Sequence, residues 1–278
     1  MTSKKEKLDQ LEQRCRDELK HDPMWYVLDK DAQMVFGSGS PDASIFFIGE
    51  APGANESKTG QPFIGQAGKL LDKHLQTIQQ TREDVYIANV LKIRPSNNRD
   101  PTTDEIKRHA PYLFEQLAII QPKVVVTLGN YSTRLILACG HTIQMRHIPE
   151  ISKLHGWFFP FRLATITMYI MPSFHPAALL HNRTPRLANA FANDFQRLHL
   201  FISLDFKQIS KLHITPPPIE EVHPATDEYP VDRFRILPIE KLCAKPKLNT
   251  DLPKWAYTSS ASSSTTTTQS SITQFFTE

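Results

Sequence analysis

Three side chains of different chemistry follow short apolar runs, and together they could bind and act on a flat heterocycle. Phe63 lies in a polar loop, where its ring could be a core plug or a platform for a stacked base. Asn89 offers an acceptor and donors side by side, which suits the edge of a pyrimidine or a plain strand end. His175 precedes the rigid Pro176 and could supply acid–base or electrostatic chemistry.

Two loops rich in glycine, proline or asparagine carry further polar candidates. The first reads IGEAPGANESKTGQPFIGQAGKLL over residues 48–71, and Gly49 would help a tight turn bring backbone N–H groups to a ligand. Glu50 and Glu56 add carboxylates to the same rim, and Asn98 lies in the second loop. A glycine-rich loop after a strand is shared by many nucleotide-binding proteins, so alone it indicates no particular substrate.

The elements that must position these residues alternate along the centre of the chain. The apolar runs occupy residues 44–48, 85–90, 123–128 and 167–171, and the helical stretches occupy residues 67–80, 103–120 and 131–139. A charged, amphipathic helix is expected over residues 1–20. Runs of Val and Ile buried on both faces favour an α/β fold, a three-layer α/β/α sandwich with a four-stranded, mainly parallel sheet. In such sheets the working residues lie beyond the carboxyl ends of the strands, where the candidates fall.

The composition is that of an ordinary globular protein. Its 278 residues, 40% of them hydrophobic and 22% charged, fit one domain over residues 1–204 with a tail. No apolar run approaches the ~20 residues of a membrane span, so we expect a soluble, intracellular monomer, nuclear if eukaryotic and in the cytoplasm or nucleoid otherwise. The cysteines Cys15, Cys139 and Cys243 have no metal-binding spacing. A net charge of +3 permits a polyanionic partner without requiring one.

The amino-acid composition of the chain changes after Phe201. Prolines crowd into the following segment, and a run of Ser and Thr begins at Ser259. A segment so poor in periodic apolar residues cannot offset the entropy of ordering it. We therefore expect residues 205–268 to be a disordered linker that leads to the last ten residues, 269–278.

The motifs in combination resemble a known family. GEAPGANE, GQPFIGQAGKLLD, YIANVLKIRPSNNRDP, PKVVVTLG and PSFHPAALL occur in this order along the chain. Their order and rough spacing are similar to those of the family 4 uracil-DNA glycosylases, the thermostable type of bacteria and archaea. The resemblance covers about residues 34–198. Five motifs in order are far more specific than any one of them.

The resemblance assigns roles around a flipped-out uracil. It implies that Phe63 stacks on the base, that Asn89 hydrogen-bonds its pyrimidine edge, and that His175 stabilises the charge on the departing base. Gly49 and Ala51 would line the same uracil pocket.

The resemblance leaves the water-activating residue open. Glu50, with Ala51, occupies the loop position where the better-known family 1 enzymes carry a water-activating Asp. Glu50, Glu56 and Asn98 are therefore all candidates for positioning the attacking water.

Four residues are candidates for contacts with DNA itself. Leu179 would be a wedge that fills the gap left by the flipped base, or else a core residue. Arg183, Arg186 and Lys92 could contact phosphates, and a solvated surface role is equally compatible with their sequence context.

The chain departs from the family where an iron–sulfur cluster is held by four cysteines. The first two cysteine positions fall near Pro23 and Tyr26, and Ile93 and His109 stand in the other two. A cluster needs thiolate ligands, so we expect no iron–sulfur cluster, no metal and no other cofactor. Apolar contacts among residues such as Trp25, Tyr26 and Ile93 are expected to take over the stapling role of the cluster.

The end of the chain carries a second motif. QSSITQFFTE places Gln269, Ile272, Phe275 and Phe276 in a Q-x-x-I-x-x-F-F pattern that resembles the PIP box, the peptide that docks on the sliding clamp PCNA. A chance aromatic pair at a frayed terminus is the alternative. We favour clamp binding because a Ser- and Thr-rich tether offers these aromatics no core of their own.

The sequence as a whole predicts a uracil-DNA glycosylase that flips uracil out of DNA, hydrolyses its N-glycosidic bond and so initiates base excision repair. Its expected partners are uracil-containing DNA and a PCNA-like clamp. One rival is a catalytically weak DNA-binding replication or repair accessory protein that a sliding clamp recruits. A second rival is a glycosylase or hydrolase for another base or nucleoside.

Overall fold

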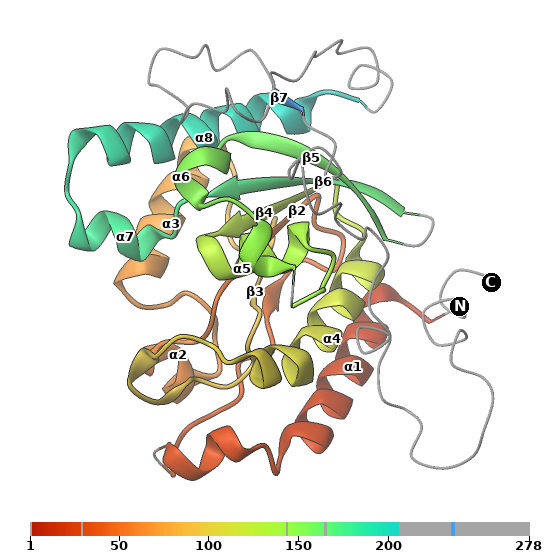
Figure 1. Cartoon of the computed structure of the whole chain (residues 1–278). Helices are drawn as coiled ribbons and strands as arrows, with labels where there is room; N and C mark the ends of the chain where they lie inside the picture. The colour runs from red at the N-terminus through yellow and green to blue at the C-terminus, as the bar shows by residue number, and fades with distance from the viewer. Residues whose placement is uncertain (1, 29, 143, 164–165, 206–234, 237–278) are drawn as a thin grey trace.

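The computed structural model describes residues 2–28, 30–142, 144–163, 166–205 and 235–236, and Figure 1 shows their arrangement. A twisted sheet forms the middle of the molecule, and helices cover both of its faces. Within these residues, no helix is both long enough and apolar enough to cross a bilayer.

The sheet has a parallel centre and antiparallel additions. Its strands are β1 (Ser38–Gly39), β2 (Ile45–Gly49), β3 (Tyr86–Asn89), β4 (Val124–Leu128), β5 (Trp157–Leu163), β6 (Ile166–Ser173) and β7 (Arg235–Ile236). They lie in the order β1-β3-β2-β4-β6-β5-β7. The pairs β2–β3, β2–β4 and β4–β6 are parallel, whereas β1–β3 and β5–β6 are antiparallel. The four central strands therefore bring their carboxyl ends to one edge.

The central strands are buried on both faces because their apolar residues alternate between two cores. Phe46 and Ile48 of β2 face the first core cluster, and Ile45 and Phe47 face the second. Successive side chains of a strand point to opposite faces, so a continuous apolar run buries both. This explains why the sequence shows unbroken runs here and no alternation with polar residues.

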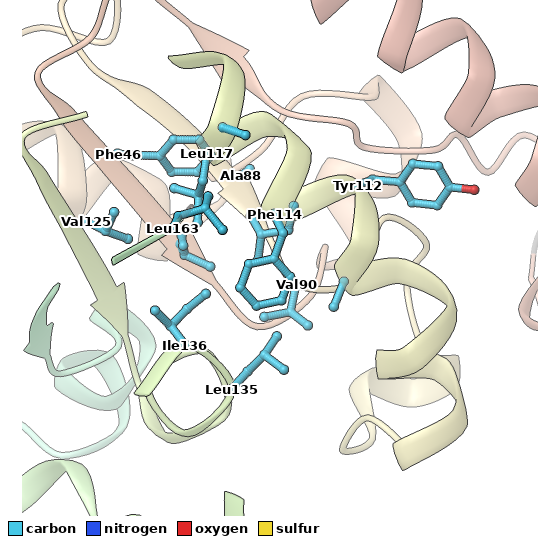
Figure 2. Packing of buried hydrophobic residues seen from close by; sticks show 14 of the residues in the cluster. Phe46, Ala88, Val90, Tyr112, Phe114, Leu117, Val125, Leu135, Ile136 and Leu163 are labelled. Atoms are coloured by element: carbon cyan, nitrogen blue, oxygen red, sulfur yellow. The ribbon is translucent and has the colours of Figure 1, made fainter. Parts of the chain in front are cut away.

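Helices of unequal length cover the two faces. They are α1 (Lys4–Leu19), α2 (Ala54–Thr59), α3 (Gln66–Thr77), α4 (Thr103–Ile120), α5 (Asn130–Leu137), α6 (Ile151–Leu154), α7 (Pro176–His181) and α8 (Pro185–Ser203), with the short 3-10 turns η1 (Pro23–Val27), η2 (Ser96–Asn98) and η3 (Met145–His147). Helices α1, α4 and α5 pack on the first core cluster, and α3 and α8 pack on the second. Figure 2 shows Phe114 and Leu117 of α4 meeting Phe46 and Ala88 of the sheet. Capping boxes at Ser3 and Thr102 begin α1 and α4.

The predicted α/β sandwich is confirmed, and the expected strands and helices correspond to β2, β3, β4, β6, α1, α3, α4 and α5. The sheet is wider than predicted because β1 pairs antiparallel with β3, β5 pairs antiparallel with β6, and β7 pairs parallel with β5. Pro160 interrupts the apolar run of β5, and a proline is tolerated mainly in strands away from the sheet centre.

The amino-terminal segment is tied to α4 by charged groups, which corrects one expectation. Asp22 is almost fully buried and accepts from the guanidinium of Arg108, Nε to Oδ2, at 2.7 Å, while Nε2 of His109 lies 3.4 Å from the same carboxylate. The sequence predicts that apolar contacts of Trp25, Tyr26 and Ile93 hold this segment in place, but Tyr26 is 80% exposed. Ile93 is fully buried, and Trp25 packs only at the edge of the core.

Asp22 should contribute strongly to stability. Burial alone would raise its pKa, but the neighbouring His109 and Arg108 and the N–H of Met24 outweigh burial and hold the pKa below its usual range. Replacing Asp22 with Ala should lower the free energy of unfolding by about 2–4 kcal/mol, because the groups that contact the carboxylate are left without their acceptor. Urea denaturation at pH 7 measures this, and exposed Asp31→Ala serves as the control.

The same variant gives a pH test. A carboxylate with a depressed folded pKa stabilises the fold above its unfolded pKa of about 3.9 and loses that contribution as the pH falls. The stability difference between wild type and Asp22→Ala should therefore shrink below about pH 4. A difference that is constant with pH would show that the carboxylate charge is not responsible.

Candidate active site

A cavity of about 370 Å³ opens at the edge where the parallel strands end. It is lined by residues from the loops after β2, β3 and β6, namely Glu50, Ala51, Pro52, Gly53, Glu56, Phe63, Ala67, Asn89, Pro95, Asn98, Arg99, His175, Ala177 and His181. The structure thus brings together all the predicted catalytic residues and three of the four predicted uracil-binding residues. The fourth, Gly49, lies directly behind them.

Gly49 makes room for the two side chains that face the cavity. It pairs with Asn89 across β2 and β3. A Cβ on Gly49 would lie 2.3 Å from Oδ1 of Asn89 and 2.6 Å from the ring of Phe63, distances at which atoms overlap. Only glycine lets the amide and the ring approach each other across the end of β2.

Phe63 is held in an uncommon backbone conformation with its ring against the cavity. Its φ is 54°, in the left-handed region that non-glycine residues rarely adopt. Arg82 donates to its carbonyl oxygen and, at 3.0 Å, to that of Pro62, and Arg82 also pairs with Asp72. Gly68 of α3 lies so close to the Phe63 carbonyl that no side chain would fit between them. These contacts fix the ring from outside the cavity.

Asn89 presents an open hydrogen-bonding position. The residue is 1% exposed, and among the described residues its Oδ1 has no hydrogen-bond partner. Leaving a buried acceptor unpaired costs free energy, and such groups mark sites where a ligand completes the hydrogen bond. The amide therefore has an acceptor available for a donor that enters the cavity.

His175 faces Phe63 and is held as a neutral ring. The ring centroids lie 5.6 Å apart. Nδ1 of His175 accepts from the N–H of Ala177 at 3.1 Å and so caps α7, which leaves the proton on Nε2. Burial lowers the pKa of His175 to about 4, against a small opposing effect of Glu56. At neutral pH the ring can donate one hydrogen bond without carrying charge.

Glu50 is the carboxylate whose protonation changes near neutral pH. Burial, assisted by the negative charge of Asp100, raises the pKa of Glu50 to about 7. Its carboxylate also belongs to the surroundings that raise the pKa of Tyr131 to about 12, where burial and Asp100 contribute most. A carboxyl group with this pKa can accept a proton from water at physiological pH.

The other two candidates for water positioning are engaged in local structure. Oε1 of Glu56 accepts from the N–H groups of Ile64 and Gly65 at 3.0 and 2.9 Å, so it ties α2 to the loop before α3. Oδ1 of Asn98 accepts from Arg94 at 2.8 Å, and the residue is exposed. Both line the cavity, and these contacts give each of them a structural role.

The predicted DNA contacts separate into two groups. Arg183 and Arg186 are exposed at the connection of α7 to α8, and Leu179 in α7 is half-buried against the second core cluster. Lys92 is wrongly predicted, because it is fully buried and donates to oxygen atoms inside the protein. Its aliphatic neighbours in sequence were the only signal of burial.

The predicted clamp-binding residues Gln269, Ile272, Phe275 and Phe276 lie outside the described residues.

Three charged or titratable side chains at the site are not among the residues predicted from the sequence. Arg99 and His181 line the cavity, and Arg82 holds Phe63 from behind. Arg99 directly follows the predicted candidate Asn98, and this position in the same loop was the one sign in the sequence that Arg99 lies at the site. Arg82 lies 19 residues from Phe63 in sequence and offered none.

The residues in the cluster positions do not suit an iron–sulfur cluster. Four thiolates are needed, and the region offers the side chains of Pro23, Tyr26, Ile93 and His109. The nearby thiol of Cys15 is buried, contacts the sulfur of Met34 at 3.6 Å, and has its pKa raised by burial to about 12.

Known proteins are similar in sequence to this chain over strands β1 to β6. The model of the Uracil DNA glycosylase superfamily matches residues 36–199. A type-4 uracil-DNA glycosylase of Sulfurisphaera tokodaii is 41% identical over 183 residues, which is 66% of this chain and 76% of the relative. Type-4 enzymes of Archaeoglobus fulgidus and Thermotoga maritima are 40% and 38% identical, over 59% and 61% of this chain and 79% and 83% of their own lengths.

The matched segment contains β1 to β6 and every loop that lines the cavity. With a family model over more than half of its length and relatives at about 40% identity, the chain belongs to the uracil-DNA glycosylase superfamily of enzymes.

Proposed function

We propose that the protein removes uracil from DNA by hydrolysing the N-glycosidic bond between N1 of the base and C1′ of deoxyribose, and so initiates base excision repair. The observation that carries this proposal is the convergence of Phe63, Asn89 and His175 on one cavity of about 370 Å³. An aromatic face, an amide and an imidazole suit a single flat pyrimidine turned out of the helix. The superfamily membership supports the same reaction.

Asn89 accounts for the choice of base. Uracil presents a donor at N3 and an acceptor at O4, which match the acceptor and donors of an amide. The unpartnered Oδ1 of Asn89 would accept from N3–H while the amide N–H₂ donates to O4. Cytosine presents the reverse pattern and would leave the buried amide unsatisfied, so it would be rejected.

His175 accounts for the departure of the base. As the C1′–N1 bond breaks, its electron pair goes to uracil, and negative charge develops on N1 and the carbonyl oxygens. A neutral ring that donates from Nε2 to a uracil oxygen stabilises this negative charge. Because the ring is neutral, the site holds no buried imidazolium charge before the substrate binds. The cap on Ala177 fixes the ring in that tautomer.

Glu50 accounts for the arrival of water. The sugar left behind resembles an oxocarbenium ion, and a water molecule adds to C1′ while one of its protons passes to a base. A carboxylate with a pKa raised to about 7 holds that proton readily. The uracil anion takes up a proton at N1 from solvent and Glu50 returns its proton to solvent, so the products are uracil and an abasic site.

The surface beside the cavity suits duplex binding. Leu179 lies in the short helix that His175 begins, so it could enter the stack once the base has left. Arg183 and Arg186 follow it on the exposed surface and can contact phosphates on either side.

A uracil-containing oligonucleotide tests the function directly. Wild-type protein should yield alkali-labile abasic sites, and His175→Ala should be slower by roughly 10²–10³-fold while binding DNA normally, because it loses a donor to the leaving group. His147→Ala, at a histidine in η3 that is not among the lining residues of the cavity, is the matched control. Absence of cleavage by the wild type would favour the DNA-binding accessory protein. Cleavage of hypoxanthine or thymine mismatches with uracil inert would favour a glycosylase for another base.

The pH profile tests Glu50. If its carboxylate is the base, kcat/KM for uracil excision should rise as the pH increases through about 7, because only the deprotonated form accepts the proton. Glu50→Gln should be much slower and should lose this inflection, whereas exposed Glu83→Gln should keep it. An inflection that survives in Glu50→Gln belongs to another group.

The carboxyl-terminal motif adds a recruitment step to the proposal. We expect the full chain to bind a purified PCNA-type clamp through Phe275 and Phe276, because paired aromatics bury most of the contact area of such peptides. Replacing both with Ala should weaken binding by more than about tenfold in calorimetry. Replacing Thr265 and Thr266 instead should leave it unchanged, and equal affinity of both variants would contradict the motif.

A further inference from the structure

Lys92 is a buried cation that the proposed chemistry does not use. Its side chain is fully buried within the first core, beside the ring of Phe36. The ammonium group donates to three oxygens, the carbonyls of Phe36 and Asn89 at 3.1 and 3.0 Å and Oε1 of Gln116 at 2.8 Å. An ammonium has three protons, so every donor has one acceptor.

This arrangement is expensive for stability alone. None of the three acceptors carries a charge, and burial lowers the pKa of Lys92 to about 7. A buried charge without a counter-ion costs free energy that an apolar side chain of similar length would avoid. The contacts of the ammonium group therefore point to a role beyond packing.

One of the three contacts leads to the cavity. The carbonyl that accepts from Lys92 at 3.0 Å belongs to Asn89, the last residue of β3, whose side-chain Oδ1 is unpartnered at the cavity. The N–H of Val90, in the same peptide, donates to the carbonyl of Gly49 on β2 at 3.0 Å, so the Asn89 carbonyl points away from β2. The ammonium group of Lys92 therefore holds this peptide from the side opposite β2.

The lysine is itself rigid. Its own N–H donates to Nδ1 of His109 at 2.9 Å, and its carbonyl accepts from Val35 at 2.8 Å. Gln116 is oriented as well, because its Nε2 donates to the carbonyl of Phe36 at 3.1 Å and to the hydroxyl of Tyr86 at 3.3 Å. Three separate segments thus converge on one nitrogen atom.

We propose that Lys92 is a positioning residue, which holds the main chain of Asn89 so that its amide meets the edge of the base. The inference rests on the proposed function, since Asn89 is taken as the base-reading residue. Lys92 touches no substrate; it acts through Asn89 alone. A contact with DNA phosphates, one of the two roles that the sequence context of Lys92 suggests, makes a different prediction.

The test compares two lysine-to-methionine variants. Lys92→Met removes the ammonium group and keeps a chain of similar length. Lys123→Met is the matched control, because Lys123 also donates to backbone carbonyls, those of Ile202 and Leu204. Lys123 directly precedes β4, so it lies at the amino-terminal end of the central strands, whereas the cavity lies at their carboxyl ends. The measurements are kcat and KM on a uracil oligonucleotide, inhibition by free uracil, thermal stability, and the side-chain amide resonance of Asn89.

Lys92→Met should lower kcat by roughly 10- to 100-fold, because a small displacement of a positioning group disrupts the reacting geometry. KM for DNA should hardly change, free uracil should inhibit more weakly, and the Asn89 amide resonance should shift. Lys123→Met should match the wild type in kcat, in KM, in inhibition by free uracil and in the Asn89 amide resonance. Gln116→Leu, which removes one acceptor, should reduce kcat by roughly two- to tenfold and keeps the test valid if Lys92→Met does not fold.

Three results would overturn the proposal. Unchanged kcat and an unchanged Asn89 resonance in a folded Lys92→Met variant would remove the lysine from the site. A raised KM with a weaker salt dependence would assign it to phosphate binding. Reduced thermal stability with full activity would make it purely structural. A wild type that cannot excise uracil would instead refute the proposed function, and the Asn89 resonance would still report on Lys92.

Discussion

The site depends on the absence of a side chain at Gly49. This residue ends β2 beside Asn89 of β3, and any Cβ there would overlap both the amide of Asn89 and the ring of Phe63. Parallel strands bring their carboxyl ends together at the place where such sheets form ligand-binding crevices, and here a Cβ at the end of β2 would fill that space. Glycine at the end of β2 converts the edge of a packed sheet into a cavity with an aromatic wall and a polar wall.

Burial then gives two titratable groups of this cavity different protonation states. Removing water disfavours charge, so the pKa of His175 falls to about 4 and that of Glu50 rises to about 7. The imidazole is thereby a neutral donor, and the carboxyl group is a base that works near neutrality. In the proposed reaction, this one physical cause prepares His175 to stabilise the leaving anion and Glu50 to take a proton from water.

Buried polar contacts behind the cavity hold its walls in place. Arg82 fixes the backbone of Phe63 from one side, and Lys92 contacts the backbone of Asn89 from the other. Lys92 is linked through its own N–H to His109, which lies against Asp22 at the amino-terminal segment. This chain of contacts occupies the region where type-4 relatives would be expected to carry a cluster, and charged and polar side chains provide the cross-links there.

The sequence by itself determined the four parallel strands, the helices α1, α3, α4 and α5 and, through the resemblance of its motifs, the cavity residues Phe63, Asn89 and His175, because apolar periodicity and loop motifs are local properties. It did not predict α8, the helix over Pro185–Ser203. It did not reveal the antiparallel edges, where Pro160 broke the apolar run of β5. Only the tertiary structure decided which polar groups are buried. Lys92 looks like any surface lysine in sequence, and its environment comes from residues up to 56 positions away. Burial and pKa depend on such distant neighbours, which one-dimensional spacing does not encode.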